Sequence, residues 1–531
     1  MSETKISVNQ AINHLLNRII LRAETSTTEF LHRTFVDIEE IASGLLRLDH
    51  QIMYGRRGTG KTHALSNLGT QLDSNGDLPV YIDLRKVGSN NGLYADSGQP
   101  LTLRATRLLI DVIEALHFQL LAKSVEDARF ESMFPLLDAV VDAATAIRVE
   151  GPISLAAEAE EENSQDESMG WHMGARAPDP NFAVGIEHGR RTSGKKRARS
   201  KIQRSGLELP RLLFGPLGRA LESAAKSIYP RRIWILFDEW SGIPIELQPL
   251  LADMLRRVVF PAQGFTVKIA SVERRSRFIE RSDAATYVGL ELGADTAAPL
   301  NLDEYLLATE AGDKAQSFFG QLLCRHIAVL AEDLGFDLPP LDPPTFLGLA
   351  FEPDAFAELV RAAEGVPRDA LNIVGLAASA AGSNKIRISH IKHAARKVYL
   401  QYKETGIAGN PAAYNTWVRL QREVVVGRRS RTFLLRRNND HNHPTILDLY
   451  DARLIHLLRP GLAAAGDPGI GYDGYSVDYG SYVHIMDEAH AAAMWDARAR
   501  PWEYNRNEVY LPDRFDEGVI FYPGKSRSSG R

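Results

Sequence analysis

The feature that most constrains this chain is a glycine-rich turn at Gly55–Thr62, with the sequence Gly-Arg-Arg-Gly-Thr-Gly-Lys-Thr. It fits the pattern G-x-x-x-x-G-K-[ST] and stands between a short apolar strand at 51–54 and a helical pattern at 62–72. Glycines let the backbone turn tightly, so successive amide N–H groups can point into one anion cavity, and the following helix adds its partial positive charge. Strand, turn and helix in this order predict an α/β fold with a phosphate-binding loop.

The last two residues of the turn carry side chains with separate tasks. Lys61 is placed to reach the β- and γ-phosphates of a nucleotide, and the Thr62 hydroxyl is placed to bind Mg²⁺. We therefore expect ATP and Mg²⁺ as the ligands of this loop. The residues expected to contact them here are Gly55, Gly58, Thr59, Gly60, Lys61 and Thr62.

A second strand ends in two adjacent carboxylates. The apolar run Ile233–Phe237 is followed by Asp238 and Glu239. A single acid at a strand end is common, but two after a buried strand, downstream of a phosphate loop, have a clear use. Asp238 can hold the metal, and Glu239 can orient and polarise the attacking water. We expect both in the nucleotide site.

The chain on either side of these motifs alternates between strand and helix patterns. Such alternation predicts a parallel α/β sheet with its ligand at the carboxyl ends of the strands. Further strands are expected at 78–84 and 265–270, and helices at 101–146, 207–228 and 247–258.

Two other regions follow the expected core. Residues 300–405 are mainly helical in pattern, and beyond residue 415 short strands at 424–426, 432–435 and 482–485 flank a helix at 446–458. We expect a nucleotide-binding core at 1–300, a helical lid at 301–405 and a small α+β module at 406–531.

A charged segment interrupts the core at about 150–205. It holds six acids in 158–167 and eight bases without an acid in 190–204. Because blocks of like charge with few apolar residues cannot supply a core, we expect a mostly disordered insertion. The basic run is either an arm that binds nucleic acid or a solvated loop that balances the acids.

Composition limits the remaining classes. A net charge of −5 gives no global positive field that would draw the chain to nucleic acid, so any such contact needs a local patch. The one cysteine, Cys324, excludes a disulfide framework and a cysteine metal site. No run of about 18 uncharged apolar residues is present, so we expect no membrane span and a cytoplasmic protein.

Four stretches in order resemble AAA+ ATPases, and among them the origin-recognition initiator group and its bacterial relatives. They are Gly55–Thr62, Ile235–Glu239, Ile269–Glu273 and Gly365–Leu371. The third is similar to a sensor-1 strand, with Ser271 as the polar sensor. The fourth is similar to the sensor-2 motif of a helical lid, with Arg368 over the γ-phosphate. The resemblance implies an AAA+ core, a lid, and catalytic roles for Lys61, Glu239 and Arg368.

The resemblance also implies partners. AAA+ proteins often receive an arginine from a neighbouring subunit, which implies a homo-oligomer or a partner subunit. The sequence does not choose among the arginines that follow the third stretch, Arg274, Arg275, Arg277 and Arg281.

In this group a winged-helix DNA-binding domain usually follows the lid. Here arginines cluster at 428–437, but no recognition helix is evident, since the helix expected at 446–458 carries Asp448 and Asp451. DNA binding, a protein interaction and a plain basic edge all stay open for this module.

Two functional hypotheses follow. The first is an ATP-driven conformational switch with slow Mg²⁺-dependent hydrolysis that acts on DNA or a DNA-bound complex. The alternative is a nucleotide-gated signalling or assembly scaffold with little turnover.

Overall fold

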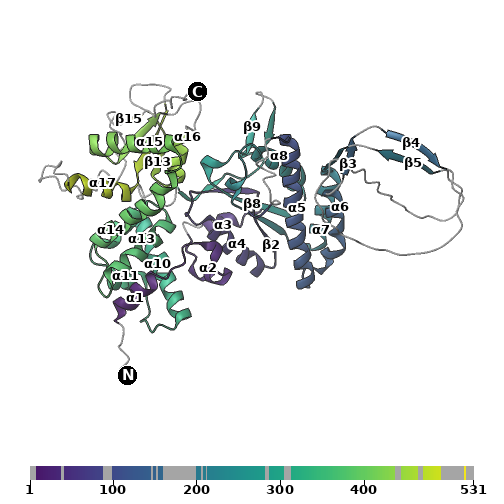
Figure 1. Ribbon diagram of the computed structural model, residues 1–531. Helices are drawn as coiled ribbons and strands as arrows, with labels where there is room; N and C mark the ends of the chain where they lie inside the picture. Colours follow the sequence, from purple (N-terminus) through teal and green to yellow (C-terminus); the bar gives the residue numbers. More distant parts are fainter. Residues whose placement is uncertain are drawn as a thin grey trace, which may run out of the picture.

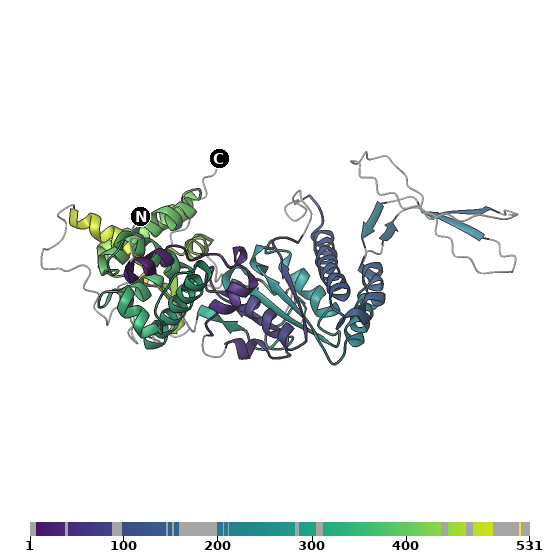
Figure 2. The same cartoon turned by 90° about the horizontal axis from the view of Figure 1, so that it is seen from below.

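The computed structural model describes residues 7–37, 41–87, 98–144, 147–150, 153–158, 199–204, 207–210, 212–281, 286–303, 312–436, 444–463, 471–491 and 520–521. Figures 1 and 2 agree on a three-part arrangement. A central sheet lies between a helical part with a small C-terminal module on one side and the helices α5, α6 and α7 on the other.

The central sheet has five parallel strands in the order β11-β1-β8-β7-β2. Because all strands run the same way, their carboxyl ends meet at one edge of the sheet. The strands are β1 (Gln51–Tyr54), β2 (Leu78–Asp83), β7 (Ile233–Asp238), β8 (Phe265–Ser271) and β11 (Leu300–Asn301).

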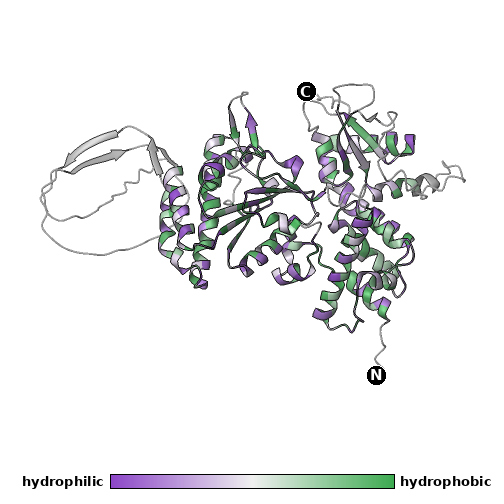
Figure 3. Cartoon of the chain, turned by 180° about the vertical axis from the view of Figure 1, so that it is seen from behind, coloured by the Kyte–Doolittle hydropathy of each residue, from purple (hydrophilic) through white to green (hydrophobic). Residues whose placement is uncertain are grey.

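The sheet is covered on both faces because its strands are apolar on both faces. Along β7, Ile233, Ile235 and Phe237 join one hydrophobic core, while Trp234 and Leu236 join another. The first core includes α5 (Leu101–Glu126), α6 (Asp138–Ala144), α7 (Phe214–Ser227) and α8 (Gln248–Val258). The second includes α3 (Ile41–Leu45) and α4 (Lys61–Ser74). Figure 3 shows hydrophobic and hydrophilic residues sharing each of these helices, as two-faced packing requires.

Two of the expected helices have different bounds. The helix expected at 101–146 is divided into α5, the 3₁₀-helix η2 (Glu131–Leu136) and α6. The helix expected from residue 207 begins only at Phe214, because β6 (Leu207–Pro210) pairs with β3 (Ile147–Glu150). Apolar and polar residues alternate along β6, which is the period of a strand.

The charged insertion is described in part. Strands β4 (Ile153–Glu158) and β5 (Arg199–Arg204) form an antiparallel pair beyond α6 and α7 (Figure 1). The acidic segment after residue 158 and the basic run at 190–198 lie outside the described residues. The disorder expected for these two segments therefore stays a prediction.

The region predicted to be a lid consists of helices around a separate core. They are α10 (Gly312–Leu334), α11 (Pro343–Ala350), α12 (Ala355–Ala363), α13 (Pro367–Ala381) and α14 (Ile388–Val398). The N-terminal helix α1 (Val8–Leu16) packs into the same core through Ile12 and Leu15, and the side-chain Nδ2 of Asn13 donates to the Gly382 carbonyl at 2.8 Å. The short helix α2 (Thr28–Thr34) lies between α10 and α4.

The C-terminal module, residues 399–491 with 520–521, has α+β structure around a third core. Its sheet has the order β13-β14-β12-β15. Its elements are η5 (Tyr399–Lys403), η6 (Glu404–Ile407), α15 (Pro411–Leu420), η7 (Gln421–Val426), β12 (Thr432–Arg436), α16 (Pro444–Asp451), β13 (Ile455–Ala463), β14 (Gly471–Val477), α17 (Tyr479–Ala491) and β15 (Ile520–Phe521).

Three expectations for this module were wrong. Residues 424–426 lie in the π-helix η7, which continues α15, because Trp417, Leu420 and Val424 share one buried helical face. Residues 482–485 lie in α17, where the Asp478 carboxylate accepts from the Ser481 amide and caps the helix start. The helix expected at 446–458 ends at Asp451, and strand β13 follows a residue with positive φ, Arg453.

The α/β core with a parallel sheet that the sequence predicts is confirmed, and helical parts accompany it, whereas its assignment to the AAA+ type stays a prediction. The C-terminal module is α+β, and its assignment as a winged helix stays a prediction, as do the domain boundaries at residues 300 and 405. Among the helices that the structure describes, none has the length and apolar character needed to cross a bilayer.

Candidate nucleotide-binding site

The strand ends bring the predicted motifs to one edge of the sheet. The Gly55 amide, directly after β1, donates to the Ser271 carbonyl at the end of β8 over 3.2 Å. The ladder between β2 and β7 sets Asp83 beside Asp238. The glycine loop and the acidic pair therefore face one another across the carboxyl edge, although they are far apart in sequence.

The loop has the backbone that its glycines permit. Gly58 and Gly60 have φ of 90° and 100°, in the left-handed region that side chains rarely adopt. A Cβ on Gly55 would stand 2.5 Å from the Thr59 hydroxyl, which donates to the Arg56 carbonyl at 2.8 Å. A Cβ on Gly60 would meet nothing within 4 Å, so the space in front of the helix start is open.

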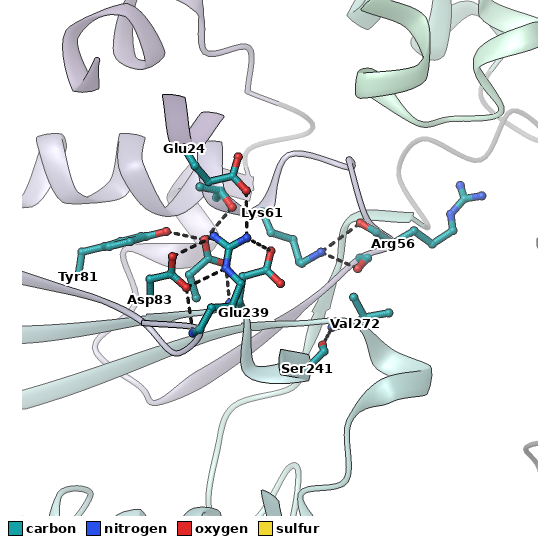
Figure 4. Close-up of polar contacts among 12 residues, drawn as sticks. Glu24, Arg56, Lys61, Tyr81, Asp83, Glu239, Ser241 and Val272 are labelled. Atoms are coloured by element: carbon teal, nitrogen blue, oxygen red, sulfur yellow. Dashed lines mark hydrogen bonds and ion pairs between the residues drawn. The ribbon is translucent and has the colours of Figure 1, made fainter. Parts of the chain in front are cut away.

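The Lys61 side chain folds back over this loop (Figure 4). Its ammonium group donates to the carbonyls of Gly55 and Arg56 at 2.8 and 3.1 Å. Burial lowers the pKa of Lys61, and the carboxylates of Asp303, Glu239 and Asp238 oppose that shift. The lysine is thus a buried cation whose partners in the loop are neutral carbonyls, and an entering phosphate would offer it a stronger one.

The Asp238 carboxylate accepts three hydrogen bonds at the edge. Its Oδ2 accepts from the Thr62 hydroxyl at 2.7 Å and from the Tyr81 hydroxyl at 2.5 Å. Its Oδ1 accepts from the Glu239 amide at 2.8 Å. Burial raises the pKa of Tyr81, and the neighbouring Asp238 charge raises it further, so Tyr81 is a donor here. The structure thereby fixes the carboxylate next to the Thr62 hydroxyl.

Glu239 stands at the turn just after β7, with a left-handed φ of 57°. Its carboxylate lies 3.8 Å from the guanidinium of Arg85. Arg85 also binds Asp83 at 2.9 Å and Glu24 at 3.4 Å, and the three acids lie close together in Figure 4. Burial opposes ionisation of Asp83, but the hydrogen bonds from Arg85 outweigh it and lower the pKa of Asp83. Glu239 is therefore held by a protein cation beside the loop.

Ser271 is buried at the end of β8 and contacts other hydroxyls. Its Oγ lies 3.2 Å from that of Ser241 and also contacts that of Ser276. Ser241 in turn accepts from the Val272 amide at 2.7 Å (Figure 4). Among the described residues, Ser271 hydrogen-bonds the loop through its backbone carbonyl and other serines through its side chain, so its expected role as a polar sensor stays a prediction.

Arg368 brings the lid to the loop. Its amide, at the start of α13, donates to the Gly58 carbonyl at 3.2 Å. Its side-chain Nε is buried and donates to no partner among the described residues. Burial lowers the pKa of Arg368, which is the cost of a guanidinium short of counter-charge. An anion at the loop would supply that charge.

Three residues that contact the candidate site were not predicted from the sequence. Tyr81 and Arg85 lie at the end of an expected strand, and the cluster of polar residues there was the available signal. Asp303, which accepts from both the amide and the side chain of Arg56, follows β11, a strand of two residues with no recognisable pattern.

The four arginines considered for a role in a neighbouring subunit all have partners in this chain. Arg274 binds Asp473 at 3.1 Å, and Arg275 contacts Asp451, both in the C-terminal module. The pairs Arg277–Glu280 and Arg281–Glu291 lie at 3.8 and 2.9 Å. None is singled out as a donor to another subunit.

The residues present fit a nucleotide with Mg²⁺. The loop offers an open amide cradle, a lysine with neutral partners and a buried arginine Nε without one. Thr62 and Asp238 supply two oxygens at one point, which is what Mg²⁺ takes from proteins when phosphates and water complete its shell. Across the described ranges, no group of three or more histidine, cysteine or acidic side chains gathers as a metal site.

Among known proteins, similarity to this chain is found only with solved structures. No family model matches the chain. No curated protein matches it either. Among solved structures, it is similar to the Orc1 protein of Aeropyrum pernix in complex with DNA, at 12% identity and a TM-score of 0.30, covering 91% of this chain and 98% of that one. It is also similar to Cdc6p from Pyrobaculum aerophilum, at 9% identity and a TM-score of 0.31, covering 91% and 99%. Neither likeness is close enough to assign a function to this chain.

Proposed function

We propose that this protein binds ATP and Mg²⁺ at the loop 55–62 and hydrolyses ATP slowly as a conformational switch. The observation that carries the proposal is the 2.7 Å contact between the Thr62 hydroxyl and the Asp238 carboxylate, directly beside the glycine loop. Two segments separated by more than half of the core meet there with the atoms that a metal–phosphate complex needs.

Each proposed site residue has a defined task. The amides of the loop, with Gly55, Gly58, Thr59 and Gly60, cradle the phosphates, and Lys61 neutralises them. Thr62 and Asp238 hold the metal. Glu239 orients the attacking water once it leaves Arg85, and Arg368 brings the lid's positive charge to the transferring group. When bound, Mg²⁺ supplies charge neutralisation on the phosphate oxygens.

The test is nucleotide binding and steady-state ATP hydrolysis by the full chain. We expect Lys61→Ala to abolish binding, and Glu239→Gln to retain binding and lose turnover. Lys268→Met is a matched control, because Lys268 is also a buried lysine that donates to two backbone carbonyls, at 2.8 and 3.0 Å, but lies outside the site. Unchanged affinity and turnover in Lys61→Ala would end the proposal.

We further propose DNA, or a DNA-bound complex, as the target of the switch. The support is local: Arg422, Arg428 and Arg429 are exposed on the C-terminal module, where η7 turns toward β12. Clustered arginines can contact phosphates without reading sequence. The proposed contact spans 428–437, of which Arg437 lies outside the described residues. The second proposed contact is the basic run 190–204.

A salt-titrated binding assay with duplex DNA tests this part. Arg428→Glu with Arg429→Glu should weaken binding and reduce the slope of log K against log salt. A matched pair of reversals at exposed residues of the core helices α7 and α8, Lys226→Glu with Arg257→Glu, should leave the slope unchanged. Equal effects of the two pairs would show that only net charge matters. Deletion of 190–204 tests the arm separately.

The second candidate is a nucleotide-gated scaffold with little turnover. It is favoured by one contact, the Arg85–Glu239 pair at 3.8 Å, which restrains the proposed base. Size-exclusion chromatography with ATP, with and without duplex DNA, separates the two candidates. Assembly into an oligomer with ATP that is indifferent to DNA supports the scaffold, whereas DNA-stimulated hydrolysis supports the switch.

A further inference from the structure

The second residue of the loop is anchored outside the loop. Arg56 is 2% exposed, and all of its polar groups are occupied. Its amide and its Nε donate to the Asp303 carboxylate at 2.8 and 2.9 Å. One terminal nitrogen donates to the Glu364 carbonyl of the lid at 2.9 Å, and the other lies 2.6 Å from Nδ1 of His456. The loop is thus tied to three parts of the molecule through one guanidinium.

His456 belongs to strand β13 of the C-terminal module and is fully buried. Because the guanidinium of Arg56 can only donate, Nδ1 must accept, and the ring proton sits on Nε2. That nitrogen faces Oδ1 of Asp478 at 3.4 Å. Burial lowers the pKa of His456 to about 3, with the nearby Arg56 charge adding to the shift against Asp478. The imidazole is therefore neutral, with one fixed tautomer.

The chain of buried charges continues into the lid. Asp478 also accepts from Lys403 at 2.6 Å, and Lys403 lies 2.8 Å from Asp369. Asp369 is the neighbour of Arg368 and contacts Arg453 as well. Both aspartates are 1% exposed. Such a network holds a defined geometry, because each charge that lost its partner would stay buried without compensation.

We propose that His456 is a positioning residue for the nucleotide loop, which makes the C-terminal module part of the nucleotide site. The imidazole holds the Arg56 guanidinium, and the Arg56 backbone carries the carbonyl that receives Lys61 at 3.1 Å and Thr59 at 2.8 Å. The inference rests on the proposed function, since it concerns the same loop. The inference goes beyond the proposed function because it assigns a role to His456, a side chain 400 residues along the chain from Arg56.

The physical reason is the charge of Arg56. Removal of the acceptor at Nδ1 leaves a buried N–H of a cation without a partner, which is among the costlier defects in a protein interior. The response that costs the least free energy is a shift of the Arg56 side chain, which would move the Arg56 backbone carbonyl as well. Lys61 and Thr59 would then lose the alignment that the phosphates require.

Two amide substitutions at one position test the role of Nδ1. In His456→Asn, the side-chain oxygen stands close to the place of Nδ1 and can still accept from Arg56. In His456→Gln, the longer amide reaches the place of Nε2, keeps a partner for Asp478 and leaves Arg56 without its acceptor. Using the full chain and a fluorescent ADP analogue with Mg²⁺, we expect Gln to raise Kd about 5- to 150-fold and Asn to stay near wild type.

A stability control separates positioning from damage to the module. Leu449→Ala opens a cavity in the same hydrophobic core without touching the charged network. It should lower Tm at least as much as His456→Gln and leave the Kd for nucleotide near wild type. Equal weakening by Leu449→Ala, or wild-type affinity in His456→Gln, would overturn the inference. The proposed function fails on other results: a wild-type chain that does not bind the nucleotide, or unchanged affinity and turnover in Lys61→Ala.

A double-mutant cycle provides a second readout that does not depend on the amides. Arg56→Met and His456→Leu each break the pair, and the double variant removes both partners. We expect the double variant to bind nucleotide no more weakly than His456→Leu alone, since no unpaired cation remains. Additive losses of affinity would show that the two side chains act independently and would contradict the inference.

Discussion

At the scale of single residues, the Asp238 carboxylate shows how the fold holds the proposed metal ligand in place. Three hydrogen bonds, from Thr62, Tyr81 and the Glu239 amide, occupy a side chain that is fully buried. Only the Thr62 contact could be anticipated from the motifs. A residue that hydrogen-bonds a metal ligand and so orients it usually raises the affinity for the metal, even though that residue never contacts the metal.

Tyr81→Phe tests this support directly. The substitution removes one hydroxyl, and we expect the Mg²⁺ concentration for half-maximal ATP hydrolysis to rise about 10-fold because Asp238 is less firmly oriented. Tyr399→Phe is the matched control, since the Tyr399 hydroxyl donates to the Glu404 carboxylate at 2.8 Å in the C-terminal module. A Mg²⁺ dependence that is the same in both variants would remove Tyr81 from the site.

Residue patterns predicted the proximity of the loop and the acidic pair, because parallel strands that deliver them must end at one edge. The same patterns could not reveal the partners of Arg56. The motif leaves its second position free, and a buried arginine looks the same in sequence as an exposed one. His456 stood in a segment expected to be helical, so no pattern connected it to the loop.

At the scale of elements, the loop depends on two glycines for different reasons. Gly58 and Gly60 both have positive φ. A Cβ on Gly58 would also stand 2.8 Å from Cβ of Arg368, where the lid meets the loop, whereas Gly60 has free space around it. Gly58 thus permits both a backbone conformation and the approach of the lid.

Gly58→Ala, Gly60→Ala and Gly76→Ala form a matched series. Gly76 follows α4 with φ of 87° and nothing within 4 Å, so it reports the backbone cost alone. We expect all three to lose about 1–2 kcal/mol of unfolding free energy. Nucleotide affinity should be unchanged in Gly76→Ala and lowest in Gly58→Ala, as measured by calorimetry. Equal affinities at 58 and 76 would contradict the lid contact.

Elements of the core were easier to predict than those of the C-terminal module. Strand β7 is a continuous apolar run bounded by charges, so its type is unambiguous. Residues 424–426 are three valines, which favour strands, but the buried face begun by Trp417 extends the helix through them. At 482–485 the decisive feature is the Asp478 cap. Tertiary packing overrode local preference in both places.

At the scale of the whole molecule, the structure buries histidines as neutral groups. Burial lowers the pKa of His326 in the lid to about 4 and that of His456 to about 3. In the unfolded chain both return to about 6.5. Between these values the unfolded state binds more protons than the folded state, so the free energy of unfolding must fall as the pH falls from 6.5.

This pH dependence can be measured by urea unfolding at pH 7.5, 6.0 and 5.0. Each of the two histidines contributes up to about 1.4 kcal/mol per pH unit below 6.5. Asp369 and Asp478 have lowered pKa values, because Lys403 outweighs their burial, so their contribution is lost only at lower pH. We expect His326→Leu to show a shallower slope than wild type. Leu323→Ala, in the same helix and core, should lower stability at every pH with an unchanged slope.

The position of α1 has a consequence for how the site could open. The lid core takes in the beginning of the chain as well as its middle, because α1 and Phe30 of α2 pack in it, whereas α3 packs on the sheet. The segment that precedes α3 therefore connects the lid core to the sheet at the N-terminal side of the nucleotide loop. A movement of the lid would have to carry this N-terminal segment with it. The segment includes Glu24, whose carboxylate reaches Arg85 at 3.4 Å.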